Sequence, residues 1–446
     1  MLEKFRHYVH SINLLCGLFL MASLPFYYPK QQLALTLFFI SYIVEFFVDM
    51  KWKHIKLSAT TWYFVGILLF FTMGFLYYPF EDSHTYFHNL TERRLALFGF
   101  AIIGIFGYNS LYKLSYFLHT IIISSTLLIL YLIIYHIGLP EFLTNENRYD
   151  LFTQARIAYV NSHMAFNLYL NIALASVWYL AVTRFKELHW SVKTIYGFSI
   201  LLIISTLLMS EGRSGFIAAI GLSAIIVIRK IWLTKKIVAI GASVFIVIGM
   251  VFAVLQHERM SEKMIEQEPR LFLWTEVALP IIQEKPILGH GLSDGQTQID
   301  SVRQGKQSKI LYELWKTNKR VDVHNQFLQT TIEFGLIGLV LLLAIYYYPI
   351  MLVNRKRMTL LLLGLFLFSL QSLFDTFITG QFAIIFGFFI TLLLTVPKSE
   401  SLNNNQTALK KPLVIRVCHL LNLLRLPKVW YVPSCLSYTS SFLFLK

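Results

Sequence analysis

The sequence predicts an all-α polytopic membrane protein with about twelve transmembrane helices and one large loop between the ninth and the tenth. Hydrophobic residues make up 56% of the 446 residues and charged residues only 14%, whereas roughly a quarter of an average soluble domain is charged. Apolar runs of about 17 to 25 residues recur along the chain, a length that crosses roughly 30 Å of hydrocarbon. The runs do not alternate in segments of about ten residues, so they do not fit the strands of a transmembrane barrel.

Each predicted transmembrane helix is an apolar run bounded by charged or turn-forming residues. The chain then divides into nine helices within 1–255, a large outer loop in 256–324, three helices within 325–397 and an inner tail in 398–446. The predicted helices cover 9–28, 32–50, 61–79, 94–110, 113–138, 164–183, 189–208, 213–229, 237–255, 325–353, 358–376 and 379–396.

Basic residues between the apolar runs predict the orientation of the helices, because cytoplasmic loops carry an excess of Lys and Arg. With twelve helices, nearly all the basic clusters fall on one side, which is therefore expected to be cytoplasmic. Arg93 and Arg94 fall on the other side and conflict with this rule. The clusters are Lys4 and Arg6; Lys51, Lys53 and Lys56; Arg184 and Lys186; Arg229, Lys230, Lys235 and Lys236; Arg355, Lys356 and Arg357; and Lys398.

The 256–324 loop is the only outer loop long enough to form a structure of its own. Charged and apolar residues recur at helical spacing in 261–283 and in 301–320, which predicts two amphipathic helices. Between them, the stretch 286–295 contains three glycines and a proline and is expected to form a turn.

The net charge of +15 does not indicate nucleic-acid binding, because the basic residues form short clusters between apolar runs instead of one patch. The three cysteines, Cys16, Cys418 and Cys435, lie outside the large outer loops, so no disulfide framework is expected. The first apolar run is long and lacks a convincing small-residue cleavage site, so we do not expect it to be a cleaved signal peptide.

Polar residues on the predicted outer side carry the chemistry that the sequence offers. Arg213 begins the eighth helix, Arg270 lies in the large loop, His324 and Asn325 end that loop, and Asp375 lies at the outer end of the eleventh helix. Two arginines suit the bidentate binding of a diphosphate, and a histidine suits the removal of a proton from a hydroxyl group. The diphosphate would then be the leaving group.

Structural explanations for the same residues remain open. Arg213 could only mark a helix end, Arg270 could be a solvated loop residue, and Asp375 could pair with a neighbouring helix. His324 could likewise be a histidine at the membrane interface, and His290 in the glycine-rich turn is a weaker candidate for the base.

Other classes of site fit the sequence less well. The stretch 212–215 resembles the Gly-x-Ser-Gly motif of rhomboid intramembrane proteases, but so short a motif occurs easily by chance, and the predicted helix count is about twice the rhomboid core. No His, Cys and carboxylate set shows metal-ligand spacing in one loop, and the glycines at 289–295 lack the Lys-Ser/Thr of a P-loop. We therefore expect neither a metal nor a cofactor.

The stretch from His324 to Gly338 resembles a signature of the bacterial O-antigen ligase and polymerase superfamily. In that signature a His is followed by Asn, Ser or Gln, nine residues, Gly, two residues, and Gly, Thr or Tyr; His324, Asn325, Gly335 and Gly338 satisfy every position. Arg213, Arg270 and Asp375 resemble the arginines and the acidic residue of the family, and Trp274 with Pro286-x-x-Gly-x-Gly resembles its loop. The resemblance covers about residues 200–395.

The resemblance implies an inverting, metal-independent glycosyltransferase of lipopolysaccharide biosynthesis. The enzyme would lie in the bacterial inner membrane with its site facing the periplasm. The implied donor is a glycan on undecaprenyl diphosphate, and the implied acceptor is a sugar hydroxyl of lipid A–core. Catalysis would rest on His324, substrate binding on Arg213, Arg270, Asn325 and Asp375, and the motif's backbone on Gly335 and Gly338.

Three alternatives stay open. The chain could be a polymerase of the same superfamily, or it could use another acceptor such as a protein Ser or Thr. It could also belong to a different class, a polyprenyl-lipid flippase or transporter, because twelve helices and cavity-facing arginines suit both. Turnover in detergent separates the classes, because a transferase joins donor and acceptor without a second compartment.

Overall fold

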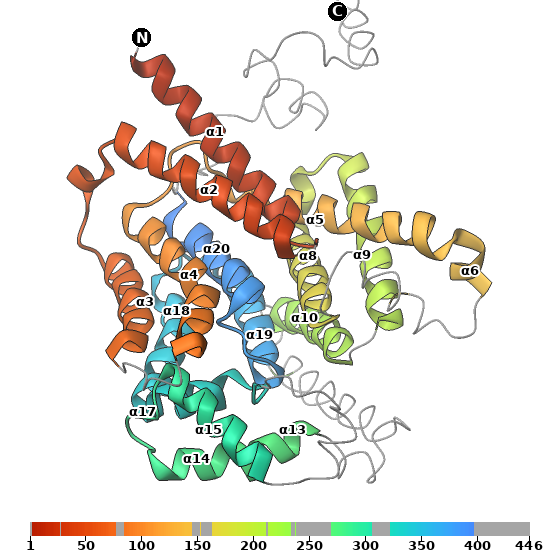
Figure 1. Cartoon of the computed structure of the whole chain (residues 1–446). Helices are drawn as coiled ribbons and strands as arrows, with labels where there is room; N and C mark the ends of the chain where they lie inside the picture. The colour runs from red at the N-terminus through yellow and green to blue at the C-terminus, as the bar shows by residue number, and fades with distance from the viewer. Residues whose placement is uncertain are drawn as a thin grey trace, which may run out of the picture.

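The computed structural model describes residues 2–26, 28–76, 84–144, 152, 163–210, 213–232, 237, 269–305 and 322–396, and within these residues it contains helices and no strands. Nearly all of the predicted ninth transmembrane helix, all of 256–268, residues 306–321 and the tail from 397 onward lie outside the described residues. The all-α prediction is therefore confirmed for the described part of the chain (Figure 1).

The described part of the chain contains helices from α1 to α20. In chain order they are α1 Leu2–Ser23, α2 Tyr28–Val48, η1 Lys51–His54, α3 Ala59–Leu76, α4 His84–Phe106, α5 Leu114–Tyr131, η3 Leu132–Ile137, α6 Leu139–Thr144, α8 His163–Arg184, η4 Phe185–Glu187, α9 Trp190–Met209, α10 Arg213–Trp232, α13 Pro269–Phe272, η6 Leu273–Ala278, α14 Leu279–Glu284, α15 Leu292–Gly305, α17 Gln326–Tyr347, α18 Pro349–Leu352, α19 Met358–Phe374 and α20 Gly380–Thr395.

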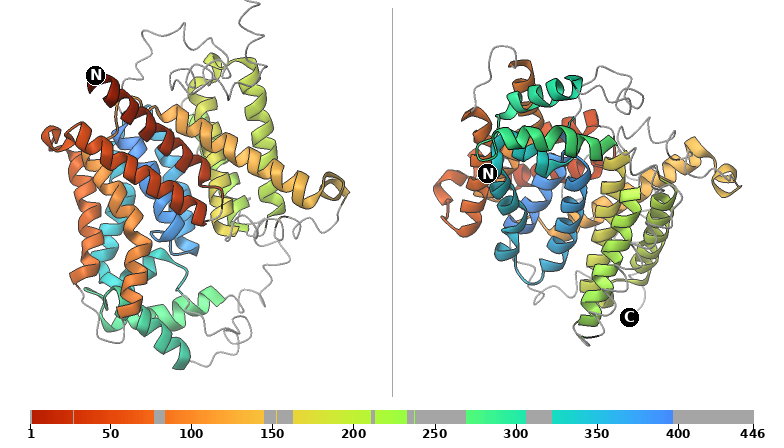
Figure 2. Two further views of the ribbon diagram at one scale, coloured as in Figure 1. Left: turned by 45° about the horizontal axis from the view of Figure 1, so that its top comes forward. Right: turned by 90° about the horizontal axis from the view of Figure 1, so that it is seen from below.

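The helices form one bundle, with α19 and α20 between two flanking groups. Figure 1 shows α3, α4 and α17 on one side and α8, α9 and α10 on the other, and the view from below in Figure 2 agrees. Four rings join α2, α4, α5 and α20 at the centre, with centroid separations of 5.5–6.0 Å: Phe38, Phe100, Phe117 and Phe388. Each of these rings is at most 1% exposed, so they form a tightly packed aromatic core.

Many of the described helices have the length and composition of membrane spans. Five are long and apolar enough to cross a bilayer: Lys30–Val48, Leu114–Ile137, His163–Arg184, Trp190–Met209 and Gln326–Leu352. Four shorter apolar helices accompany them: Ala59–Phe75, Ser214–Arg229, Met358–Phe374 and Gly380–Thr395. These helices fit a multi-pass membrane protein, while the number of twelve spans stays a prediction.

Two contacts describe where basic clusters lie in the bundle. Lys51 Nζ donates to the carbonyl of Gly107 at 2.8 Å, and the Tyr179 hydroxyl near the end of α8 donates to the carbonyl of Lys356 at 3.2 Å. From Arg357 at this end, α19 runs to Asp375 at the other. The contact of Tyr179 with Lys356 brings the end of α8 close to the 355–357 cluster, as the predicted orientation requires, while the grouping of the other clusters stays a prediction.

Arg94 is not an exception to the excess of basic residues on the cytoplasmic side, although the sequence suggested that it was. Its side chain is buried, and its Nη2 lies 2.6 Å from Oε2 of Glu333 on α17. Because the charge is neutralised inside the protein, Arg94 carries no information about which side of the membrane it faces.

The span predicted over 325–353 matches the apolar stretch Gln326–Leu352, but a break that the sequence did not predict interrupts it. Gly335 has φ 62° and ψ −161°, which breaks α17 into a first part, 326–334, and a second part, 336–347. The break lies against the 286–291 segment, where the carbonyls of Pro286 and Ile287 accept hydrogen bonds from Leu336 N at 2.8 Å and Ile337 N at 3.4 Å. The predicted turn over 286–295 is also shorter than expected, because α15 already begins at Leu292.

Glycine is required on both sides of this contact. A Cβ atom on Gly335 would overlap the carbonyl group of Ile287, and a Cβ on Gly289 would lie 2.5 Å from the backbone nitrogen of Gly335. Both residues also have positive φ values, 62° and 75°, which residues with side chains rarely adopt.

Gly335→Ala should therefore destabilise the protein by about 2–4 kcal/mol, from the positive φ and the overlap together. The midpoint of thermal unfolding in detergent should fall accordingly. Gly197→Ala on α9 is the matched control, because nothing lies within 4 Å of its added Cβ and alanine favours a helix. Equal midpoints for the two variants would contradict the close backbone contact at Gly335.

Candidate functional site

Four segments that are distant in sequence meet at the end of the bundle where α19 finishes. Arg213 is the first residue of α10, and the next two residues line a small cavity with Gln371 of α19. Arg270 of α13 places its guanidinium carbon 6.0 Å from the ring centroid of Phe374. His324 and Asn325 precede α17, and Asp375 ends α19. The structure thus places Arg270 and His324 near the end of α19. The side chain of Arg213 lies outside the described part of the chain, so its place in the site stays a prediction.

His324 faces Asp375 across this site. Its Nδ1 lies 3.5 Å from Oδ1 of Asp375, longer than a good hydrogen bond but within the distance of an ion pair when the ring is protonated. The carboxylate is held in place because the same Oδ1 accepts a hydrogen bond of 2.9 Å from Thr376 N. The His324 side chain is 32% exposed, so the ring is accessible while one of its nitrogens faces the carboxylate.

The backbone of His324 is in an uncommon conformation. Its φ of 51° lies in the left-handed region, which non-glycine residues rarely occupy and which occurs disproportionately at functional sites. Neighbouring contacts hold it there. The Val323 carbonyl accepts from Trp274 Nε1 at 2.9 Å, and the Asp322 carboxylate accepts from the Thr376 hydroxyl at 3.1 Å.

Asn325 is the N-cap of α17. Its Oδ1 accepts a hydrogen bond from Leu328 N at 3.0 Å, and its Nδ2 donates to the carbonyl of Leu373 at 3.3 Å. Both ends of the amide are thus used inside the protein. The geometry favours a role in building the helix start over the substrate contact that the sequence suggested.

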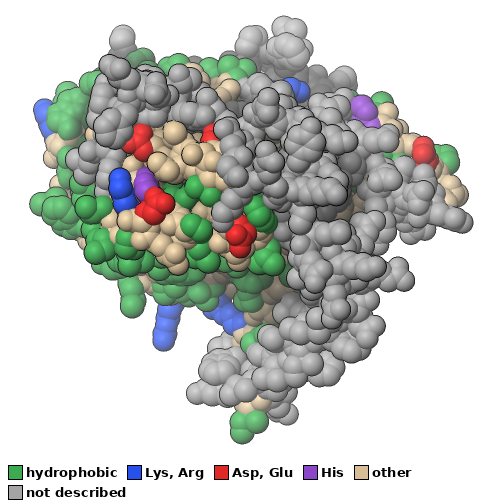
Figure 3. Space-filling model, turned by 60° about the horizontal axis from the view of Figure 1, so that its bottom comes forward, with side chains coloured by type: hydrophobic (Ala, Val, Ile, Leu, Met, Phe, Trp, Pro, Cys, Tyr) green, Lys and Arg blue, Asp and Glu red, His purple; other side chains and the backbone are tan. Residues whose placement is uncertain are grey.

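A small hydrophobic core fixes the loop helices to the first part of α17. Figures 1 and 2 show α14 and α15 lying across the end of the bundle, and Figure 3 looks onto this end, where charged and histidine side chains gather among hydrophobic ones. The core residues are Leu273, Val277, Ala278, Ile281, Ile299, Val323 and Ile332. Since Val323 directly precedes His324, this core also anchors the candidate site.

His290 is structural instead of catalytic. Its side chain is 5% exposed, and Nε2 lies 3.0 Å from the carbonyl oxygen of Ile281, to which it must donate because a carbonyl only accepts. Its backbone nitrogen donates to the carbonyl of Ile332 at 2.8 Å. The weaker base candidate from the sequence therefore ties the loop to α17.

Sequence reasoning missed several residues of the site. Glu333, Gln326 and Thr376 were not singled out, although a carboxylate inside an apolar run is itself a signal of a special role. Gln326 uses Oε1 to accept from Ile378 N at 2.8 Å, which connects the start of α17 to the turn after Asp375. Glu333 pairs with Arg94 and also accepts from Gln329 Nε2 at 2.9 Å.

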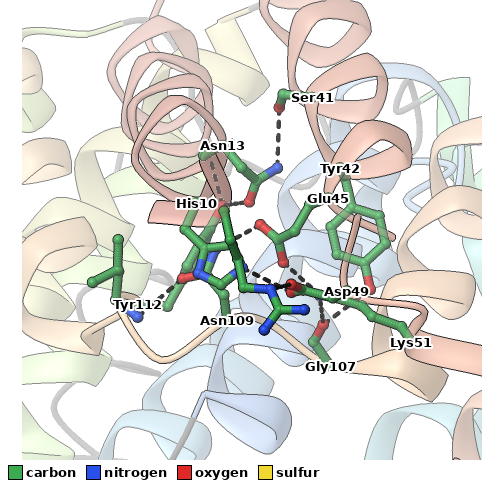
Figure 4. A network of polar contacts seen from close by, with 12 residues as sticks. His10, Asn13, Ser41, Tyr42, Glu45, Asp49, Lys51, Gly107, Asn109 and Tyr112 are labelled. Carbon is green, nitrogen blue, oxygen red and sulfur yellow. Dashed lines mark hydrogen bonds and ion pairs between the residues drawn. The ribbon is translucent and has the colours of Figure 1, made fainter. Parts of the chain in front are cut away.

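A second polar cluster, drawn in Figure 4, lies where α2 ends, at the end of the bundle away from α14 and α15 in Figure 1. There His10, Glu45 and Asp49 have ligand atoms within 4.8 Å of one another, a metal-type set that sequence spacing did not reveal. The carboxylates already face cations, however: Lys51 Nζ lies 2.5 Å from Glu45, and Arg6 Nε lies 3.1 Å from Asp49. The charges balance within the protein, so the cluster fits an ion-pair network better than a cation site.

The fold and the site define a multi-pass helical membrane protein with a histidine–carboxylate pair at one end of its bundle. Residues 198–343 match the O-antigen ligase family. This match confirms the resemblance that the His324 motif predicted, and it contains Arg213, Arg270 and His324. Asp375 and Arg94 lie outside it.

Two curated relatives are similar to part of the chain. A Rickettsia conorii protein named "Putative polysaccharide ligase" is 31% identical over 157 residues, covering 33% of this chain and 36% of the relative. An uncharacterised Haemophilus influenzae protein is 29% identical over 188 residues, covering 36% of this chain and 45% of the relative. The chain thus spans less than half the length of both relatives. Together with the family match, the named relative supports the O-antigen ligase and polymerase superfamily.

Replacing the cap residue distinguishes capping from substrate contact at Asn325. Asn325→Ala should cost about 0.5–2 kcal/mol of stability, whereas Asn325→Ser should keep most of it because a hydroxyl also accepts from the first turn of a helix. Thermal unfolding in detergent measures both. If the serine variant unfolds as early as the alanine variant, the hydrogen bond to Leu328 N is not the main contribution of this side chain.

Proposed function

We propose that the protein is an O-antigen ligase-like glycosyltransferase. It moves a glycan from undecaprenyl diphosphate to a sugar hydroxyl of lipid A–core, without a metal, at the periplasmic face of the bacterial inner membrane. The observation that carries this proposal is the contact of His324 with Asp375 at one end of an apolar bundle, beside Arg270. The family match over residues 198–343 supports it.

His324 acts as the general base. Its Nδ1 faces Asp375, which leaves Nε2 to accept the proton of the acceptor hydroxyl. The Asp375 carboxylate holds the ring and stabilises the imidazolium that forms, as the acidic member of a catalytic triad does. In this proposal Asp375 orients the base, in place of the substrate-binding role that the sequence suggested.

Arg270 and Arg213 bind the diphosphate of the donor. The guanidinium of Arg270 lies near the face of Phe374, so its planar donor edge remains suited to two-point contacts with phosphate oxygens. The acceptor oxygen forms a bond to the anomeric carbon as the bond from that carbon to the diphosphate breaks. The diphosphate leaves with the electron pair, and the arginines stabilise its developing charge.

The chemistry of this site is shared by a polymerase, whose acceptor is a second lipid-linked glycan. A glycolipid gel of a deletion strain separates the two functions. Loss of all long chains on the core supports the ligase, whereas a band with a single repeat supports the polymerase. A flippase is less well supported, because His324, Arg270 and Asp375 lie at one end of the bundle and not along its middle.

His324→Ala should lower the transfer rate by about 100- to 10,000-fold, the usual contribution of a general base, while donor binding persists through the arginines. Initial rates with purified donor and acceptor in detergent, together with a separate donor-binding titration, measure the two effects. His54→Ala is the control, since His54 is exposed on η1 at the opposite end of the bundle. Lost donor binding with an intact rate for bound donor would make His324 a binding residue.

Arg270→Ala should raise the barrier by about 2–4 kcal/mol, roughly a 30- to 1000-fold loss of rate, because one charge-assisted contact to the leaving group is removed. Arg270→Lys should restore activity only in part, since an ammonium group cannot make the planar two-point contact. Lys285→Ala serves as the control, because Lys285 is an exposed cation of the same segment. Equal rates for Arg270→Ala and the control would show that Arg270 does not contact the donor.

A further inference from the structure

The first part of α17 ends in a buried ion pair. Glu333 is the penultimate residue before the break at Gly335, and its carboxylate lies 2.6 Å from Arg94 Nη2 of α4, 239 residues away in sequence. The two side chains are 6% and 1% exposed. The other carboxylate oxygen accepts from Gln329 Nε2 at 2.9 Å. The pair therefore joins two distant helices through fully desolvated charges.

Stability alone does not explain why charges occupy this position. Removing two ions from water costs several kcal/mol for each, and well-packed apolar residues in place of a buried pair are often as stable or more stable. An ion pair differs from apolar packing in its geometry, because it is satisfied in only one relative placement of its two helices. Such a pair selects one arrangement of the elements that it joins.

The pair lies on a buried polar face of the 326–334 helix. Gln326, Gln329 and Glu333 recur at helical spacing on this face, and each is at most 3% exposed. Gln326 is held at the start of the helix by Ile378 N at 2.8 Å. At its end, the carbonyl of Glu333 accepts from Gly291 N at 2.8 Å. The rotation of this short helix about its axis is thus set by polar contacts at both ends.

Glu333 is too far from His324 to act on the substrate there. The two residues are nine positions apart, which corresponds to roughly 14 Å along a helix. Any effect of the pair on the reaction must therefore pass through the helix that connects them.

We infer that Arg94 and Glu333 are positioning residues for the transfer reaction: the pair fixes the rotation of the 326–334 helix and so aims His324 at the acceptor hydroxyl. The inference rests on the proposed function of His324. Apolar side chains at 94 and 333 would still bury the helix and would leave the contacts of Gln326 and of the Glu333 carbonyl, but they would remove the charged contact that ties the end of this helix to α4.

The main test replaces both charges at once. Arg94→Met with Glu333→Met should keep the unfolding midpoint within a few degrees of the wild type, because neither charge is left unpaired. The donor KM should stay unchanged, while kcat should fall by about 10- to 100-fold, the size expected when a reacting group is misplaced by about an ångström. Wild-type kcat in this variant would overturn the inference and leave the pair purely structural.

The matched control removes a buried ion pair at the other end of the bundle. Lys51→Met with Glu45→Met breaks the network of Figure 4, in which these side chains are 9% and 0% exposed. This variant should keep the wild-type kcat per folded molecule whatever its unfolding midpoint. An equal loss of kcat in the control would mean that the effect is a general loss of rigidity, which also overturns the inference.

A double-mutant cycle shows whether the pair acts through His324. In a His324→Ala background the Arg94 and Glu333 substitutions should cause no further loss, because no ring remains to be aimed. If the Arg94 and Glu333 substitutions lower the rate by the same factor with and without His324, the positioning role is contradicted. A wild-type rate for His324→Ala alone would instead refute the proposed base, so the two failures are distinguishable.

Glu333→Gln keeps the test decisive if the double variant does not fold. The amide preserves the shape of the side chain and can still accept from Arg94, but it removes the charge. Hydrogen exchange of the amides in 327–334 should be faster than in the wild type, with unchanged exchange in α20. Unchanged exchange throughout 327–334 would show that the charge does not fix this helix.

Discussion

The architecture of the site depends on the contact between two stretches of backbone, the 286–291 segment and the break in α17 at Gly335. A helix that stops and restarts leaves carbonyl and amide groups without their usual partners, and each costs several kcal/mol where water is absent. Here the carbonyls of Ile332 and Glu333 accept from His290 N and Gly291 N, while Leu336 N and Ile337 N donate to Pro286 and Ile287. The break in α17 is tolerated because the 286–291 segment forms hydrogen bonds with the backbone groups that the break leaves unpaired. The same hydrogen bonds hold the 286–291 segment against α17.

This backbone contact explains why two motifs that are far apart in the chain both contain glycine. Gly289 of the loop and Gly335 of the His324 motif lie so close that neither has room for a side chain. The glycines of the two motifs therefore allow the backbones to touch. At the start of the same motif, Asn325 caps α17 and His324 lies one-third exposed beside Asp375.

Exposure and partners separate a side chain that can reach a substrate from those that can act only through the protein. His290, Arg94 and Glu333 are buried, and each has a partner within the protein. The cluster around Glu45 at the opposite end follows the same rule, because its carboxylates face Lys51 and Arg6. His324 differs, since its ring is one-third exposed and lies beside a carboxylate that is fixed by another contact. The site also extends beyond residues 198–343, because Asp375 and Arg94 come from outside that segment.

The sequence by itself determined the helical membrane class and the residues that meet at one end of the bundle. Apolar runs and basic clusters are local properties, and hydrophobic length and charge act on each helix separately. The sequence could therefore indicate that Arg270, His324 and Asp375 share one side. It could also relate the His324 motif to its family.

Only the tertiary structure decided how these elements are held. The break at Gly335 requires a loop some 45 residues earlier in the chain to supply its hydrogen bonds, and the partner of Glu333 lies 239 residues away on α4. The same is true of Asn325, whose amide is used by Leu328 and Leu373. Hydropathy and spacing report whether a residue is buried, but not which group it meets. The partner of a buried polar group depends on which distant helices pack together, so it was decided by the fold.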